Sequence, residues 1–304
     1  MHKLFNKLLK LMNQTSVNIN INLDALLGEL QRSLQWTINL VALALKVELL
    51  TDDDSILRLP LATFPATFDQ GLKWTPVEAM ENNNNWILSN GFRDVIEGTS
   101  SFVESAHNNV LSFWKLINLQ KSGIDLCGED WNREIVSGEN SFHRLGLPDK
   151  FNHIKREHGV APDATLLRQV LSVNSARNCL VHRNGVVTER DITNGGELKV
   201  EWRKLVTFLE DEDGEYDLVF GQKTSKDSWL CIKNVDHCKT FQLGERITFT
   251  TQEFSDVTWG LFVFGIDLVQ KINAIGLNNG FVKEREQSPQ GVQPNGSATA
   301  GSTG

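Results

Sequence analysis

Arg177, Asn178 and His182 are the polar residues of the stretch "SARNCLVHRNG" (175–185) whose chemistry suits a phosphate. A guanidinium grips a phosphate through a planar fork of N–H donors. An imidazole titrates near neutral pH and can therefore transfer a proton. If the stretch is helical, a turn of about 100° per residue places these three side chains and Asn174 on one strip. The apolar residues of the segment fall on another face.

A purely structural role explains the same spacing. A histidine in the last turn of a helix is favoured by the helix dipole, and Arg177 can pair with an acid on a neighbouring helix. Glu97 and Glu104 lie seven residues apart, so they share a helix face, and each is either exposed or part of an ion pair. His107 follows on the same helix, and nothing in the sequence fixes its direction. Both roles for Arg177 remain open from spacing alone.

The segment from His143 to Asn184 is basic, although the whole chain has a net charge of -8. It also carries four of the seven histidines. A local cationic excess of this kind is the expected place for an anion to bind. The segment has three acids, at 149, 157 and 163, and seven lysines or arginines, at 144, 150, 155, 156, 168, 177 and 183.

The elements that must position these residues follow from periodicity and capping signals. Apolar residues at three- and four-residue steps predict long helices, with a kink near Gly98 in the second, and Asp163 is the expected N-cap of the fourth. Gly185 is a natural helix stop, and Ser255 is the expected cap of the last helix. We expect helices over 22–50, 86–119, 147–157, 164–184 and 255–275, a hairpin over 198–220, and strands over 228–235 and 245–251.

The predicted fold is mainly α, a helical bundle with a small antiparallel β insertion before the last helix. Residues 1–75 are expected to form an N-terminal helical segment of unknown role, which begins with an amphipathic stretch (1–14). Residues 76–285 form the main domain, with the β-rich insertion at about 186–250. The small polar residues of 286–304 predict a disordered tail.

Composition narrows the class of protein. The chain is 40% hydrophobic, which is enough for a sizeable core. Its four cysteines form no C-x-x-C pair, so reduced thiols and a cytoplasmic location are expected. The most apolar run (36–50) is interrupted by charges and is shorter than the roughly 20 residues of a bilayer span, so no stable membrane insertion is expected. The motifs of phosphate loops and zinc proteases are absent from the sequence, and we expect no cofactor and no metal.

The hexapeptide "RNCLVH" (177–182), followed by Gly185, resembles the R-x4-H motif of HEPN ribonucleases. The resemblance covers roughly 80–275, interrupted by the strands, and implies a HEPN-like bundle. It also implies metal-independent endoribonuclease activity in a homodimer whose motif helices face each other. On this resemblance His182 is the general acid or base for attack by a ribose 2′-hydroxyl. Arg177 holds the scissile phosphate, and Asn178 orients the imidazole or the phosphate.

The resemblance also suggests how RNA is held and in which setting it is cut. Asn174, Arg183, Lys155 and Arg156 are the expected further RNA contacts. Toxin, antiviral and stress-response roles are typical of the family, and a regulatory or antitoxin partner belongs to such a setting. Some toxin members carry a regulatory tyrosine two residues after the histidine, where this chain has Asn184. The alternative function is a non-catalytic HEPN-like module that binds protein or RNA.

Overall fold

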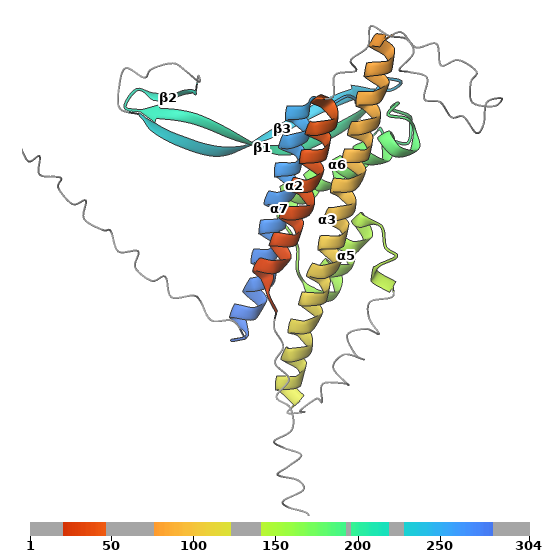
Figure 1. Cartoon of the computed structure of the whole chain (residues 1–304). Helices are drawn as coiled ribbons and strands as arrows, with labels where there is room; N and C mark the ends of the chain where they lie inside the picture. Colours follow the sequence, from red (N-terminus) through yellow and green to blue (C-terminus); the bar gives the residue numbers. More distant parts are fainter. Residues whose placement is uncertain (1–20, 47–75, 123–140, 193–195, 219–227, 282–304) are drawn as a thin grey trace, which may run out of the picture.

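The computed structural model describes residues 21–46, 76–122, 141–192, 196–218 and 228–281 (Figure 1). Within them the chain is mainly helical, with a small antiparallel sheet before the last helix, so the predicted fold class is confirmed at this level. The elements are α2 (Leu23–Lys46), α3 (Pro76–Ser122), α5 (Leu147–His158), α6 (Ala164–His182), β1 (Glu197–Asp211), β2 (Gly214–Asp217), β3 (Trp229–Gln242) and α7 (Thr251–Asn278).

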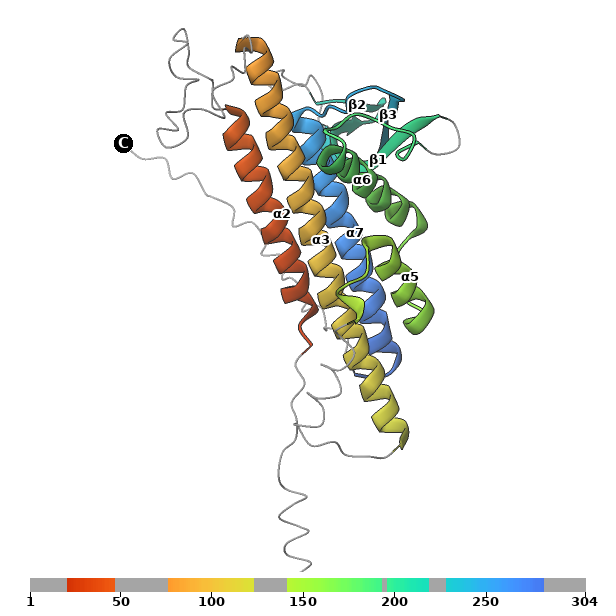
Figure 2. The same cartoon turned by 90° about the vertical axis from the view of Figure 1, so that its right-hand side faces the viewer.

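The long helices α2, α3 and α7 run side by side and enclose the main core (Figures 1 and 2). By length and composition α7 could cross a bilayer. In the structure, however, its residues at three- and four-residue steps, including Phe264, Leu268 and Ile272, are buried against the other helices. This burial pattern is typical of the core helix of a helical bundle.

Helix α2 belongs to the same core as α3 and α7. Its residues Leu26, Leu30 and Leu34 are buried in that core. Gly98 of α3 faces Ser33 of α2, where a Cβ would come within 2.5 Å of the hydroxyl oxygen. The helix runs without interruption through Gly98, and the glycine permits close approach of α2.

The predicted boundary near residue 75 does not separate two cores. Predictions for residues 1–20, 47–75 and 282–304, including the amphipathic start and the tail, lie outside the described residues.

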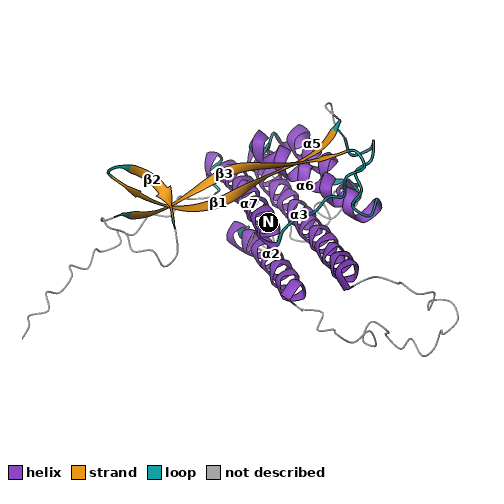
Figure 3. Ribbon diagram, turned by 90° about the horizontal axis from the view of Figure 1, so that it is seen from above, coloured by secondary structure: helices purple, strands orange, loops and turns teal. Residues whose placement is uncertain are grey.

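The sheet is a three-stranded antiparallel ribbon of order β2-β1-β3. β1 pairs with β3 along its length, from Glu197 opposite Gln242 to Glu210 opposite Trp229. The predicted Asp-Gly turn joins β1 to β2. Leu198, Val200 and Trp202 of β1 are buried against the bundle, whereas Trp229, Leu230 and Ile232 of β3 are exposed. Figure 3 shows this end of the ribbon reaching away from the helices.

The predicted strand over 245–251 is wrong. Val186 and Arg246 form an isolated bridge, and Ile247 and Phe249 bury their side chains without a strand ladder in the described structure. The predicted cap at Ser255 is wrong as well, because Thr250 caps α7 through a reciprocal capping box with Glu253. Helix α7 therefore begins four residues earlier than predicted, and it ends at Asn278 rather than before Gly276.

Helix α6 matches its prediction closely and packs against α3, α7 and β1. Asp163 accepts hydrogen bonds from the amides of Thr165 and Leu166 at 2.9 and 3.1 Å. The helix ends at His182, and Gly185 takes a left-handed φ of 72° while its amide donates to the Cys179 carbonyl at 3.1 Å. The caps thus fix where the polar strip ends.

Candidate functional site

Arg177 lies on α6 facing α3, and its guanidinium is only partly satisfied. Nη1 donates to Asn178 Oδ1 at 3.0 Å, and Nη2 lies 3.5 Å from Glu97 Oε1 of α3. The second distance is beyond the usual range of a strong hydrogen bond. Nε is buried and has no partner among the described residues. The side chain as a whole is 21% exposed, so the guanidinium is reached by solvent elsewhere than at Nε.

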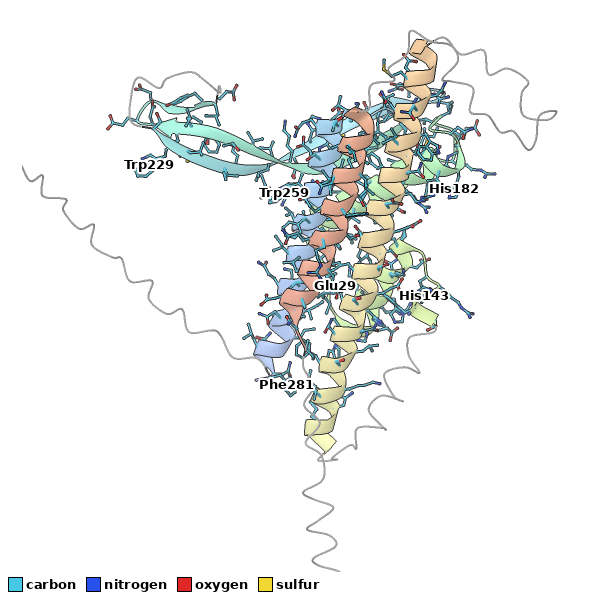
Figure 4. The ribbon with its side chains drawn as sticks, viewed as in Figure 1. Glu29, His143, His182, Trp229, Trp259 and Phe281 are labelled. Atoms are coloured by element: carbon cyan, nitrogen blue, oxygen red, sulfur yellow. The ribbon has the colours of Figure 1, made fainter. Side chains whose placement is uncertain are left out.

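His182 is the last residue of α6 and is exposed. Figure 4 shows it at the outer edge of the bundle. Asn174, one turn before Arg177, is half-buried on the same helix. The structure therefore places the predicted polar strip along the terminal turns of α6, with the imidazole open to solvent.

Arg183 follows the helix and is committed to a local contact. Its Nε donates to Asp191 Oδ2 at 2.7 Å, and its Nη2 donates to the other carboxylate oxygen. Asp191 is 2% exposed and also accepts from the amide and hydroxyl of Thr188. Burial alone would raise the pKa of Asp191, but the bonds from Arg183 and Thr188 bring it below its usual value. Arg183 therefore holds the loop after α6 in place.

Lys155 and Arg156 lie in the last turn of α5 and are exposed. Arg156 Nε lies 2.7 Å from Glu157 Oε1. The chain then enters α6, whose 19 residues put His182 about 27 Å along the axis from the first residue. These cations and the Arg177 strip therefore lie at different ends of α6 and cannot hold the same phosphate.

The predicted cationic excess is largely neutralised by acids from elsewhere. Five of the seven cations are in ion pairs, with Glu157 as the only acid from within the segment. The four acids from outside the segment equal its excess of four. These acids are Glu97, Glu104, Asp191 and Glu201.

Lys150 was counted among the cations that could bind an anion, but the structure buries it. It is 3% exposed and donates to Ser100 Oγ at 2.7 Å and to Glu104 Oε1. Glu104 also contacts His143 Nδ1 at 3.0 Å. Burial would raise the pKa of Glu104, but its bonds to Lys150 and His143 lower it on balance. A signal was present, because Lys150 shares the buried face of α5 with Phe151 and Ile154.

A second polar cluster was missed. His107 of α3 meets His153 and His158 of α5, and one ring nitrogen of each lies within 4.8 Å of the others. The direction of His107 could not be told from the sequence, and the structure places its ring against α5. Since 46 residues separate His107 from His153, no local motif could reveal the contact.

Comparison of the chain with family models, with curated proteins and with solved structures gives no match. Function therefore has to be argued from the chemistry of the sites, because a fold alone hosts many functions. Two sites stand out among the described residues: the Arg177 strip and the cluster formed by His107, His153 and His158.

Proposed function

We propose that the protein is a HEPN-like, metal-independent endoribonuclease that cuts RNA at the Arg177 strip. The observation that carries this proposal is the loosely paired guanidinium of Arg177 on the same helix as an exposed imidazole, five residues before it. Because phosphate oxygens accept charge-assisted hydrogen bonds from a guanidinium, an RNA phosphate is a suitable partner for Nη2 in place of Glu97. Glu97 is 59% exposed, so moving it aside costs little.

In the proposed reaction His182 accepts the proton of a ribose 2′-hydroxyl. The 2′-oxygen forms a bond to the adjacent phosphorus, and the bond from phosphorus to the 5′-oxygen breaks. Arg177 stabilises the negative charge that develops on the phosphate oxygens, and Asn178 holds the guanidinium through Nη1. At the composite site of a homodimer, solvent protonates the leaving 5′-oxygen. The products are a 2′,3′-cyclic phosphate and a 5′-hydroxyl.

The test is RNA cleavage by the purified chain in EDTA, with the ends of the products analysed. Arg177→Ala and His182→Ala should each lower the rate about 100-fold or more, because each removes charge stabilisation or proton transfer. Arg93→Ala and His237→Ala are matched controls, since Arg93 also contacts Glu97 and His237 is an exposed imidazole on β3. Full activity of either Arg177→Ala or His182→Ala would refute the mechanism. Products that carry no phosphate at the 3′ end would refute it as well.

Mixing the two inactive variants tests whether the site is composite. If Arg177 of one subunit works with His182 of the other, each mixed dimer has one intact site. Random exchange of subunits should then restore about a quarter of the wild-type rate. A mixture that stays inactive while subunits exchange would place both groups of the working site in one subunit.

The alternative function is a non-catalytic HEPN-like module that binds protein or RNA. It is favoured by the carboxylate of Glu97 beside Arg177, where a substrate phosphate would lie. Such a module would bind RNA without cutting it, and His182→Ala would leave that binding unchanged. A filter-binding assay beside the cleavage assay separates the two functions.

The proposed setting is cytoplasmic, as a toxin or a component of antiviral or stress defence restrained by a regulatory or antitoxin partner. Growth arrest on expression, relieved by Arg177→Ala and by His182→Ala at equal protein levels, is the expected result. Arrest that persists in both variants would count against this setting.

A further inference from the structure

Three histidines, one from the C-terminal half of α3 and two from α5, converge in the structure. His107 comes from α3, His153 from the middle of α5, and His158 is the last residue of α5. The ring centroids of His107 lie 5.3 Å from those of both His153 and His158. Phe142 stacks on His107 with a centroid distance of 3.8 Å and an interplanar angle of 10°. The His107 ring is therefore held in one orientation by packing.

The polar atoms of this cluster lack the partners that buried imidazoles normally have. His107 is 2% exposed, and neither of its ring nitrogens makes a hydrogen bond within the described chain. His158 Nε2 is likewise buried without a partner there. Buried polar groups in proteins are nearly always satisfied, so the nitrogens of His107 are candidate ligands for an ion. Apolar residues would fill this space at lower cost.

We propose that His107, His153 and His158 bind a divalent transition metal ion, with Zn²⁺ as the fitting species. Imidazole nitrogen is a preferred ligand of Zn²⁺ at about 2.0–2.1 Å, which puts tetrahedral ligand nitrogens about 3.3 Å apart. The ligand atoms lie within 4.8 Å of one another, so small ring rotations bring them to this distance. One ion then satisfies a lone pair of each imidazole.

Charge and access agree with this assignment. Burial, followed by the repulsion of His158 and His153, lowers the pKa of His107 to about 4. Burial, followed by His153, lowers the pKa of His158 as well. The rings of His107 and His158 are therefore neutral near pH 7, which is the form that binds a metal. His153 and His158 are half-buried, so the cluster lies close to the surface, where a water could take the fourth position.

His158 can adjust to the ion because of its place on α5. It lies five residues after His153, which is not the usual spacing for two ligands on one helical face. However, His158 is the last residue of the helix. Gly159, which follows it, has a left-handed φ of 68° and ends α5 there. The bound ion would tie the end of α5 to α3. Along α5, His158 lies about two turns beyond Lys150, which contacts Glu104.

The experiment uses the full chain, stripped with a chelator and dialysed. Zn²⁺ is titrated in competition with a chromophoric chelator, and Co²⁺ is added separately as a spectroscopic probe. One tight site per chain is expected, with a tetrahedral Co²⁺ spectrum and a rise of roughly 5 °C in Tm on Zn²⁺ binding. His107→Phe keeps the stacking on Phe142 and should weaken binding at least about 100-fold.

His237→Ala and His182→Ala are the controls that should keep the site, since neither histidine belongs to the cluster. If His107→Phe does not fold, the pair of partly exposed ligands replaced together, His153→Ala with His158→Ala, serves in its place. Zn²⁺ affinity in either cluster variant equal to that of the wild type would overturn the assignment. So would the absence of a tight site in the folded wild-type chain.

The nuclease proposal and the metal proposal fail separately. RNA cleavage is measured in EDTA on chains whose fold is checked by circular dichroism, whereas metal binding is read without RNA. A folded, metal-free chain that still cuts RNA would leave both proposals intact.

Discussion

Glu97 and Glu104 lie two turns apart on one face of α3, and each meets a cation from the basic segment. Glu97 is 59% exposed and lies 3.5 Å from Arg177 at the end of α6. Glu104 is 26% exposed and bonds to Lys150, whose side chain is 3% exposed. The same residue type on the same helix face thus makes one loose surface pair and one buried pair.

The difference shows where ligand binding can be sought. At the buried pair the ammonium donates to both Ser100 and Glu104. At the exposed pair the guanidinium retains an orphaned Nε. One turn beyond Glu104, His107 is buried and unsatisfied among the described residues. Among these contacts of α3, unmet hydrogen-bonding capacity rather than net charge separates Arg177 and His107 from Lys150.

The largest contrast between the pairs should appear on removal of each glutamate. Glu104→Ala leaves the ammonium of Lys150 buried without its charge partner, and a loss of about 3 to 5 kcal/mol in the free energy of unfolding is expected. Glu97→Ala is the matched control and should cost less than about 1 kcal/mol. Urea denaturation with a common m-value measures both.

The double variant Glu104→Ala with Lys150→Met checks the cause of that loss. Because it removes the stranded charge, it should recover a large part of the stability. Equal losses from the two single variants would show that burial does not separate the pairs.

The metal-free chain should lose stability on mild acidification through His107. Its pKa is lowered to about 4 in the folded state because burial disfavours the charged ring. In the unfolded chain the pKa returns to about 6.5, so the unfolded state takes up the proton first and stability falls as pH falls. The stabilisation is complete above about pH 6.5, and about 2 kcal/mol should be lost between about pH 7.5 and pH 5.

Most carboxylates stay ionised over this range, which isolates the histidines. Urea midpoints of the EDTA-treated wild type and of His107→Phe give the comparison. The variant should lose less, and identical pH dependence would show that His107 has the same pKa in the folded and unfolded states.

Local signals in the sequence were enough for most helices and for the end of α6. Asp163 and Gly185 act as predicted because capping depends on neighbouring residues alone. The capping box of Thr250 with Glu253 was also visible, but the apolar alternation of "ERITFTT" favoured a strand. There Ile247 and Phe249 alternate inward without strand pairing in the described chain, which periodicity cannot distinguish from a strand.

Long-range contacts could not be predicted in the same way. The sequence identified Glu97 and Glu104 as candidate partners but could not assign them, because the assignment depends on how α5 and α6 cross α3. The local charge of the basic segment overstated its attraction for anions, since the neutralising acids come from α3, β1 and the loop at Asp191. The histidine cluster required the same packing information.

The smallest change tests the exposed pair itself. Glu97→Gln removes a charge that lies 3.5 Å from Arg177, and the unfolding free energy should change by less than about 1 kcal/mol. If Arg177 binds the scissile phosphate, Glu97 competes with RNA for the guanidinium. The variant should then lower KM several-fold with little change in kcat, because a competing ground-state contact has been removed.

Asp94→Asn is the control for that change. It makes the same change of charge three residues away on α3, where Asp94 contacts Arg93 and not Arg177. An equal fall in KM in the control would assign the effect to net charge alone, whereas loss of cleavage in a folded Glu97→Gln variant would make Glu97 part of the catalytic site. A fall in KM confined to Glu97→Gln would support Arg177 as the phosphate-binding group, because it is the guanidinium within 4 Å of Glu97 on the facing helix.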